Sequence, residues 1–592
     1  MREKLKRSAR NDRMFFRVVP EILIYQVITK IMLFVIVMAL KQNALLVLYH
    51  TGRSALTSGD LPFLLRTKGG IVLALIGIIV LVVYTVFDVN AMFILADSVL
   101  YQRKKSWWIV LKEAFVSLKY FTHPQGLFVT LYLSLLGPLI GTAVGFSFMV
   151  GFSAPNFVLT YISSKPWLRA LVILGVMLYV FVAGIYVFTI LNVVFQKEKI
   201  NVAMKSSRKM VTENWRVFLF SMLIFLLKAF LIGLVLFVGL YGLPLNLIRM
   251  IPLSVEVSRT LKIFSLTVFS LVYFTYPLLL CPFLAIRITT LYKSFSGEKT
   301  VDLGERDYKI GWKRVAVVLA LAIGLFSVYG AINFDEVFPI SNNTKIVAHR
   351  AGGNLGTENT LSALQQSIDH KIPVAEIDVQ RTLDGKYIVC HDSNLKKTTG
   401  REGNPTELTL QEVKSYSLKN HIYPWEEGEK ISTLEEMLDA SKGKIELFLE
   451  LKGATADKQM VRDVYQMLKE RDMVSTCTMI CFNYDLIEYI EEVYPEVETG
   501  YLVYFSFGNL EELDCDTYIV ETECLSSDEI NRIHASGKKV GVWTVNTSSE
   551  LNRWLLTPVD YVITDEVLTA KMLKKYIYNG EDEVRIIQTL MK

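Results

Sequence analysis

Seven long apolar stretches in the N-terminal half of the chain constrain its fold more than any other feature. A helix of about 20 mostly apolar residues spans the hydrocarbon core of a bilayer. Charged residues are sparse across this half and frequent from residue 345 to the end. The sequence therefore predicts an all-α transmembrane bundle of about seven helices over 1–335 and a separate domain over 336–592. The seven stretches are 21–40, 70–96, 126–152, 169–195, 217–243, 262–286 and 314–332.

Lysine and arginine residues fall mainly in alternate loops between these stretches. The N-terminal tail and the second, fourth and sixth loops are rich in them, whereas the other loops carry few. Positive charge favours the cytoplasmic side of a membrane, and short loops carry most of this signal. We therefore expect a multi-pass protein of the cell membrane with a cytoplasmic N-terminus. Seven crossings then place the domain over 336–592 outside the cytoplasm.

Short apolar runs alternate with amphipathic stretches in the C-terminal half. Eight such runs over roughly 230 residues fit a (β/α)8 TIM barrel, which typically takes about 250 residues. A further run over 386–392 follows Asp384-Gly385, a strong hairpin signal, so we expect a returning ribbon after the second barrel strand. The eight runs are 345–349, 374–380, 445–451, 476–482, 499–505, 516–521, 539–545 and 559–565.

Three carboxylates fall at the carboxyl ends of expected barrel strands, where barrel enzymes place their reactive groups. Glu376 and Asp378 alternate along the second strand and so face the same way, and Glu450 lies near the end of the third. Converging carboxylates repel each other unless a cation neutralises them. Oxygen ligands suit a hard divalent ion, so Ca²⁺ or Mg²⁺ is the expected cofactor, with no basis for choosing between them.

Basic side chains lie beside these carboxylates. The alternative to a metal site is a salt-bridge network that uses Arg350 and Lys452. Both residues also suit the binding of a phosphoryl group, whose transition state accumulates negative charge. His349 ends the first strand and His391 ends the returning ribbon, and two histidines supply a general acid and a general base near neutral pH.

Five motifs of this domain, in this order, closely resemble the glycerophosphodiester phosphodiesterase family. The resemblance implies a TIM barrel in which Glu376, Asp378 and Glu450 ligate the metal and His349 and His391 act as acid and base. It also implies that the glycerol 2-hydroxyl attacks phosphorus and displaces the alcohol, and that water then opens the resulting cyclic phosphate to give glycerol 3-phosphate. The motifs are AHRAGGNLGTENTLSAL (348–364), EIDVQRTLDGKYIVCHDSNLKKTTG (376–400), ELFLELK (446–452), GVWTVN (541–546) and VDYVITD (559–565).

Some positions depart from the family pattern or admit two interpretations. Ala351 stands where the family commonly has glycine, and Thr357 where it has proline, so both changes fall in the loop after the first strand. Glu358 and Asn359 either orient the site or cap the helix that follows. Trp543 matches a family aromatic that packs against the glycerol, and a plain core tryptophan is its alternative.

The N-terminal half resembles the multi-helix membrane domain fused to some bacterial members of this family. The leading hypothesis is thus a membrane-embedded enzyme whose substrate is a glycerophosphodiester, a lysophospholipid or a poly(glycerol phosphate) such as teichoic acid. The alternative is a transporter or flippase with the barrel as a processing module. Its only support is three ionisable residues in or near the apolar stretches, Lys30, Asp88 and Lys228. A lipid-binding bundle, a homo-oligomerisation unit and a bare anchor remain open for the helices.

Charge and cysteine content exclude other classes of protein. The net charge of +5 is small for 592 residues, and no basic helix with interleaved aromatic residues is present, so we expect no nucleic-acid partner. None of the six cysteines forms a CxxC or a zinc-like spacing, and we expect them to be free thiols in the core.

Overall fold

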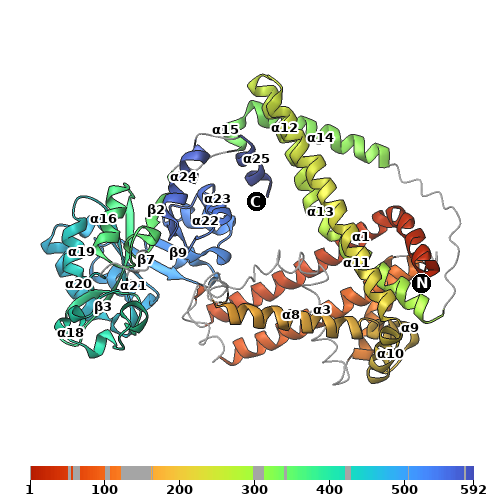
Figure 1. Cartoon of the computed structure of the whole chain (residues 1–592), viewed down its shortest axis with the longest axis horizontal. Coiled ribbons are helices and arrows are strands. Elements are labelled where there is room, and N and C mark those ends of the chain that lie inside the picture. Colours follow the sequence, from red (N-terminus) through yellow and green to blue (C-terminus); the bar gives the residue numbers. More distant parts are fainter. Residues whose placement is uncertain are drawn as a thin grey trace.

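The computed structural model describes residues 2–50, 55–57, 67–100, 107–121, 162, 165–297, 312–338, 343–419, 428–504, 506–578 and 582–591. A helical region precedes a barrel domain in the chain, and the two lie side by side (Figure 1). The helix α15 (Phe334–Val337) lies across the predicted boundary between residues 335 and 336.

Within the described residues, five helices are long and apolar enough to cross a membrane. They coincide with five of the seven predicted stretches, and the stretch over 126–152 lies outside the described residues. The last stretch forms α14 (Trp312–Ile332), whose apolar part is shorter. Three of the five spans lie in single helices, and two each run through a pair of consecutive helices. The single helices are α1 (Arg2–Tyr49), α3 (Lys68–Leu100) and α13 (Val255–Phe295). The pairs are α8 (Pro166–Tyr186) followed by α9 (Thr189–Gln196), and α11 (Trp215–Phe237) followed by α12 (Leu243–Met250).

Two charges inside the bundle, on α1 and α3, pair with each other. Lys30 Nζ lies 3.6 Å from Asp88 Oδ2, and the Tyr25 hydroxyl donates to Asp88 Oδ1 at 2.7 Å. Asp88 is 3% exposed. A charge at membrane depth is costly unless it is paired, so these contacts explain why both residues are tolerated there. Lys228 lies on the exposed surface of α11.

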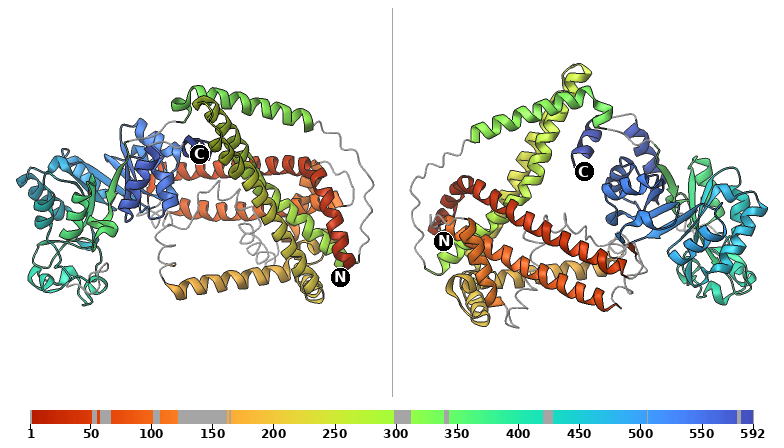
Figure 2. Two further views of the ribbon diagram at one scale, coloured as in Figure 1. Left: turned by 45° about the horizontal axis from the view of Figure 1, so that its top comes forward. Right: turned by 180° about the vertical axis from the view of Figure 1, so that it is seen from behind.

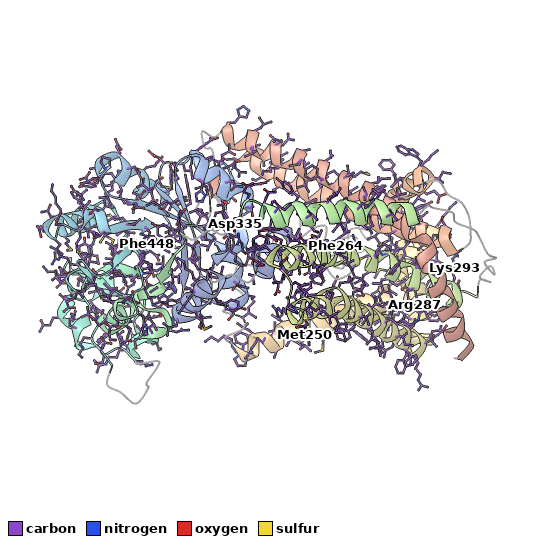
Figure 3. All side chains as sticks on the ribbon, turned by 90° about the horizontal axis from the view of Figure 1, so that it is seen from above. Met250, Phe264, Arg287, Lys293, Asp335 and Phe448 are labelled. Carbon is purple, nitrogen blue, oxygen red and sulfur yellow. The ribbon has the colours of Figure 1, made fainter. Side chains whose placement is uncertain are left out.

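The helices of the membrane domain have one end toward the barrel and the other away from it, as the two views of Figure 2 show. The helix α13 begins near the barrel and ends far from it: Met250, just before α13, lies toward the barrel, whereas Arg287 and Lys293 lie at the remote end (Figure 3). Lys293 Nζ pairs there with Asp97 Oδ1 at 3.3 Å. The amphipathic α10 (Ile200–Glu213) and the short α4 (Trp107–Ser117) pack at the same remote end, where the helical region has its main buried core.

Eight parallel strands form the barrel, which confirms the predicted fold. Each strand pairs in register with its neighbours, and β2 pairs with both β11 and β3, which closes the sheet. The strands are β2 (Lys345–Ala348), β3 (Val374–Arg381), β5 (Glu446–Leu451), β6 (Cys477–Cys481), β7 (Thr499–Val503), β9 (Thr517–Glu521), β10 (Lys539–Trp543) and β11 (Tyr561–Thr564).

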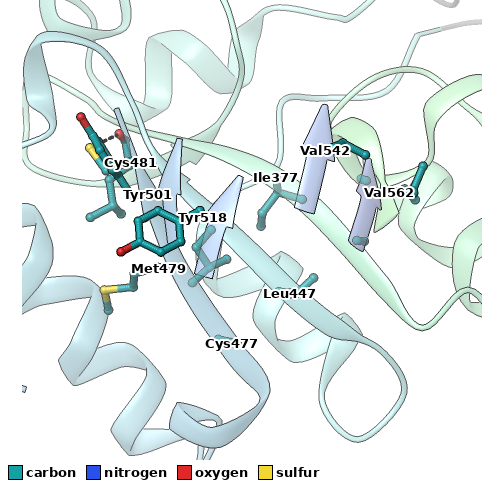
Figure 4. Close-up of a cluster of buried hydrophobic side chains, with 14 of the residues drawn as sticks. Ile377, Leu447, Cys477, Met479, Cys481, Tyr501, Tyr518, Val542 and Val562 are labelled. Atoms are coloured by element: carbon teal, nitrogen blue, oxygen red, sulfur yellow. Dashed lines mark hydrogen bonds between the residues drawn. The ribbon is translucent and has the colours of Figure 1, made fainter. Parts of the chain in front are cut away.

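Alternate side chains of these strands enter two different cores, because successive residues of a strand point to opposite faces. Val374, Phe448 and Ile480 fill the barrel interior. Their neighbours in the sequence pack outward against the helices, as Figure 4 shows for Ile377, Leu447, Met479, Tyr501 and Val542. The flanking helices are α16 (Leu361–Asp369), α19 (Leu434–Ser441), α20 (Lys458–Glu470), α21 (Tyr484–Val493), α22 (Ser527–Ala535), α23 (Ser548–Leu555) and α24 (Val567–Tyr578).

The predicted returning ribbon is present as β4 (Tyr387–Val389), which pairs antiparallel with the end of β3. Gly385 in the turn has a φ of 74°, a conformation that glycine adopts without strain. This ribbon carries the chain to His391 beside the barrel mouth. It is followed by the short helices α17 (Lys396–Thr399) and α18 (Leu410–Ser415).

Two elements join the barrel to the helical region. The C-terminal helix α25 (Asp582–Met591) packs on α13, and Ile586 is buried there with Ile263 and Phe334. The strand β1 (Ala55–Thr57), between α1 and α3, pairs antiparallel with β8 (Ser506–Gly508), in the connection that follows barrel strand β7.

Candidate active site

Three carboxylates meet at the carboxyl ends of β3 and β5. Glu376 and Asp378 share the inward face with Val374, and Glu450 shares it with Phe448, so the strand period aims all three into the mouth. Asp378 and Glu450 are directly opposite each other in the parallel register. One carboxylate oxygen from each residue lies within 4.8 Å of the others, and all three residues are buried.

The cluster has the chemistry expected of a site for a hard divalent cation. It offers only oxygen ligands, which Ca²⁺ and Mg²⁺ prefer. Glu376 Oε2 accepts the Arg350 backbone N–H at 2.7 Å, whereas Glu376 Oε1 is buried without a hydrogen-bond partner. A buried oxygen without a partner is costly, and a cation would satisfy it. These residues therefore fit a divalent metal.

Two basic side chains pair with the same carboxylates. Lys452 Nζ lies 2.7 Å from Glu450 Oε1 and 3.1 Å from Asp378 Oδ1. Arg350 Nη1 lies 2.7 Å from Glu358 Oε2, and its Nε lies 3.9 Å from Asp378 Oδ2. The predicted salt bridges and the predicted acidic cluster are therefore both present. Four carboxylates face two cations, so negative charge remains for a divalent ion to balance.

The two histidines are each held by a carboxylate. His349 Nδ1 lies 2.7 Å from Asp565 Oδ1, and His391 Nδ1 lies 2.8 Å from Asp392 Oδ1. The pKa values of Asp565 and Asp392 are both lowered, so each accepts a hydrogen bond as a carboxylate. Each Nδ1 therefore carries a proton, so Nε2 is the nitrogen of each ring that suits proton transfer to or from a substrate.

Burial and charge push the pKa values of these groups apart. Burial, with the charge of Asp378, raises the pKa of Glu450 to about 7 and that of Glu376 well above its usual range. Burial acts the same way on Asp378, but Lys452, His391 and Arg350 outweigh it and hold its pKa below the usual range. Burial also lowers the pKa of His391, so this imidazole is neutral near pH 7.

The loop after β2 brings two more residues to the carboxylates. Asn359 Nδ2 donates to Asp378 Oδ2 at 2.8 Å, and Glu358 binds Arg350 as described above. The helix α16 is capped by Thr360, whose side chain accepts the Ala363 N–H, so neither Glu358 nor Asn359 is the cap. The loop needs unusual backbone angles, which explains why glycine suits position 351: Ala351 has a φ of 75°.

Aromatic residues line one side of the mouth. Trp543 ends β10, the seventh barrel strand as predicted, and its ring lies 5.5 Å from that of Phe482 in a T-shaped contact. Phe482 also lies 6.0 Å from Tyr504. A cavity of about 550 Å³ adjoins this side and reaches His391, Glu450, Lys452 and Phe482. Trp543 is half-buried, between the barrel core and the mouth.

Three supporting residues were missed from the sequence. Asn546 and Asp565 are the last residues of the GVWTVN and VDYVITD motifs, and the Asn546 amide donates to Asp565 at 2.5 Å. Gln380 is 3% exposed, and its amide donates to the carbonyls of Cys390, His391 and Asp392 at 2.9, 3.1 and 3.2 Å. Gln380 and Asp565 lie at the carboxyl ends of expected barrel strands, and this position is the sequence feature that could have indicated their role in the site.

Fold and site together define a TIM-barrel enzyme joined to a helical membrane domain. Comparison with known families gives the same two parts. Residues 349–569 match the Glycerophosphoryl diester phosphodiesterase family, and residues 9–329 match the Membrane domain of glycerophosphoryl diester phosphodiesterase. The chain belongs to the glycerophosphodiester phosphodiesterases that carry this membrane domain. Both predicted resemblances are confirmed.

Relatives of known name cover the barrel part of the chain. A glycerophosphodiester phosphodiesterase of Caldanaerobacter subterraneus is 26% identical over 231 residues, 38% of this chain and 94% of the relative. A glycerophosphodiester phosphodiesterase of Bacillus subtilis is 24% identical over 286 residues, 43% of this chain and 94% of the relative. A phosphodiesterase structure of Oleispira antarctica, solved with the product sn-glycerol-3-phosphate, is 26% identical to this chain, with a TM-score of 0.37. The match covers 39% of this chain and 96% of the Oleispira chain.

Proposed function

We propose that the barrel hydrolyses glycerophosphodiesters to sn-glycerol 3-phosphate and an alcohol, with a divalent cation held by Glu376, Asp378 and Glu450. The observation that carries this proposal is the buried carboxylate cluster flanked by two carboxylate-held histidines at one barrel mouth. A bound cation, Ca²⁺ or Mg²⁺, would withdraw electron density from the phosphoryl oxygens and so favour attack at phosphorus. The names of the relatives support the substrate class.

The chain's own residues supply the proton transfers. His391 is neutral near pH 7 and suits the base that takes the proton from the glycerol 2-hydroxyl as its oxygen attacks phosphorus. His349, held by Asp565, suits the acid that protonates the departing alcohol oxygen. The roles then reverse as water opens the cyclic phosphate. Arg350 and Lys452 favour the negative charge that builds on the phosphoryl oxygens, and Trp543 supplies an apolar wall for the glycerol.

We place the barrel outside the cytoplasm, on a multi-pass membrane domain with a cytoplasmic N-terminus. The loops poor in lysine and arginine lead to the helix ends near the barrel, whereas the sequence rich in these residues follows the end of α13 that carries Arg287 and Lys293, far from the barrel (Figure 3). Such a location favours substrates derived from lipids or from cell-wall polymer, such as lysophospholipid or poly(glycerol phosphate). The ion pair of Lys30 with Asp88 gives both residues a structural role, which removes two of the three hints for the transporter alternative.

A substrate panel on the purified full chain tests the proposal. Hydrolysis of glycerophosphocholine, glycerophosphoglycerol, lysophospholipid and teichoic-acid fragments is measured after chelation and after Ca²⁺ or Mg²⁺ is returned. We expect activity that chelator abolishes, that one of the ions restores, and that Glu376→Ala or Glu450→Ala eliminates, since each removes a ligand. Full activity in excess chelator would refute the metal site.

A further inference from the structure

The barrel mouth is joined to the membrane domain through a backbone pairing. The strand β8 lies in the connection after β7, at the end of the barrel that carries the active site. It pairs antiparallel with β1, with Ala55 opposite Gly508, Leu56 opposite Phe507 and Thr57 opposite Ser506. A segment of the membrane domain thus extends a loop of the active-site face by one strand.

This pairing borders the aromatic side of the mouth. Tyr504, two residues before β8, lies against Phe482, which in turn contacts Trp543. The connection is anchored beyond β8 as well, since the Ser506 hydroxyl bonds Glu529 of α22 at 3.3 Å. The position of β1 is therefore coupled through a short segment to the aromatic wall beside the cavity.

The strand β1 lies near the end of a membrane helix. Ala55 lies six positions after Tyr49, the last residue of α1, and a chain of six extended residues reaches roughly 20 Å at most. The aromatic side of the mouth is therefore tethered, through β8 and β1, to the end of the candidate membrane span Ile24–Val47. An alcohol group that leaves the site past this wall would meet the acyl region of the membrane after a short spacer.

The C-terminal helix α25 makes a second attachment to the membrane domain. On α25, the buried Glu583 lies 3.2 Å from Lys262 of α13 and also binds Arg249 of α12. Asp582 binds Arg259 at 3.3 Å, and Arg585 binds Asp335 at 2.7 Å. The chain is thus attached to the membrane domain at two places, β8 and α25, which restricts how far the mouth can turn relative to that domain.

We propose that β1 is a specificity-determining element that adapts the mouth to glycerophosphodiesters whose alcohol is anchored in the bilayer. The inference rests on the proposed function and adds the class of leaving group. The free glycerol phosphate end enters the cluster at Glu376, while the alcohol passes Phe482 and Tyr504 toward the membrane. Soluble diesters use the same chemistry without needing β1.

The test compares two substrates that differ only in anchoring. The full chain in phosphatidylcholine vesicles is given glycerophosphoethanolamine or its N-palmitoyl derivative. We expect the double variant Leu56→Pro/Thr57→Pro, which removes backbone donors from β1, to lose about tenfold in kcat/KM for the palmitoylated substrate, a change of about 1.4 kcal/mol. Its kcat/KM for the soluble substrate should stay within about twofold of the wild type. Thr57→Val, which keeps the backbone donor and suits a strand, should match the wild type on both.

A cross-link tests the pairing directly. Leu56→Cys/Phe507→Cys places cysteines at directly opposed positions, whose Cα separation in an antiparallel pair suits a disulfide. We expect oxidation to cross-link this variant and to leave Leu56→Cys/Met572→Cys and each single variant uncross-linked. The cross-linked enzyme should keep its activity on the palmitoylated substrate.

Three outcomes would overturn the inference. If the proline variant loses activity equally on both substrates, β1 has only a structural role, and if it loses none, β1 has no role in specificity. If no cross-link forms, the pairing is absent in the membrane. A wild-type protein inactive on both substrates would instead refute the proposed function on which the inference depends, and so the two failures are distinguishable.

Discussion

At the scale of single residues, the histidines depend on neighbours that take no part in proton transfer. Asp565 and Asp392 fix which nitrogen of each imidazole carries the proton, and Asn546 fixes Asp565. Gln380 holds the segment of His391 through three carbonyl groups. Such supporting residues typically change activity by 10- to 100-fold, about 1.4 to 2.7 kcal/mol, without touching the substrate.

Replacing Gln380 should misplace His391 and leave the acidic cluster intact. We expect Gln380→Met, which keeps the size of the side chain but removes its donors, to lower kcat by roughly 10- to 100-fold. Calorimetric affinity for Ca²⁺ or Mg²⁺ should not change. The matched control is Gln466→Met on the exposed face of α20, which should have no effect. A loss of metal affinity in Gln380→Met would show that this residue supports the carboxylates instead.

Metal binding should depend on pH because the carboxylates hold protons in the metal-free protein. The pKa of Glu450 is raised to about 7, so this group is mostly protonated at pH 6 and mostly ionised at pH 8. A cation requires the ionised form, so the ionisation of Glu450 alone should raise the affinity by about tenfold between pH 6 and pH 8. Titration calorimetry in buffers of different ionisation enthalpy would report both the affinity and the released proton. Equal affinities at the two pH values would contradict the raised pKa.

At the scale of elements, the loop after β2 links two parts of the site. It packs on α16 on one side and on the end of β11 on the other, where the Asn354 N–H donates to the Asp565 carbonyl at 2.8 Å. Gly353, with a φ of 54°, has no room for a side chain, since a Cβ there would overlap the backbone of Asp565. The conformation of this loop thus decides where Asp565 holds His349.

Gly353→Ala should separate the loop from β11. We expect a loss of about 1–3 kcal/mol of stability together with a large fall in kcat, since Asp565 and His349 move apart. Gly537→Ala is the control: its φ is 80°, but a Cβ there meets nothing within 4 Å, so it reports backbone strain without the clash. Thermal unfolding and kinetics on both variants give the comparison. Equal effects on stability and kcat would mean that strain alone is responsible.

At the scale of the whole molecule, the C-terminal helix makes the membrane domain and the barrel one unit. The core around Ile586 draws residues from α12, α13, α14 and α25. The buried Glu583 binds Arg249 and Lys262, so basic residues at the barrel-facing ends of α12 and α13 have a partner on α25. This arrangement also explains how residues far apart in the chain determine where the mouth points.

Removing the carboxylate of Glu583 should weaken this docking. Glu583→Ala removes the buried carboxylate that pairs with Lys262 and Arg249, and we expect it to lower the stability of the full chain by about 1–3 kcal/mol. Hydrolysis of a soluble diester should change little, because the residue does not belong to the site. Glu488→Ala, at an exposed position of α21, serves as the control. An unchanged melting temperature in Glu583→Ala would show that α25 does not hold the barrel.

The sequence by itself determined the two-part architecture, the barrel and its ribbon, because the strand period of two and apolar length are local properties that survive in any tertiary context. It also determined which carboxylates and histidines gather, since strand ends of a barrel meet at one face. The pairing of Lys30 with Asp88 and the support from Gln380 and Asp565 depend on the tertiary structure. So does the contact of β1 with β8. These contacts join residues whose distance depends on how whole elements pack, and no local pattern in the chain encodes that distance.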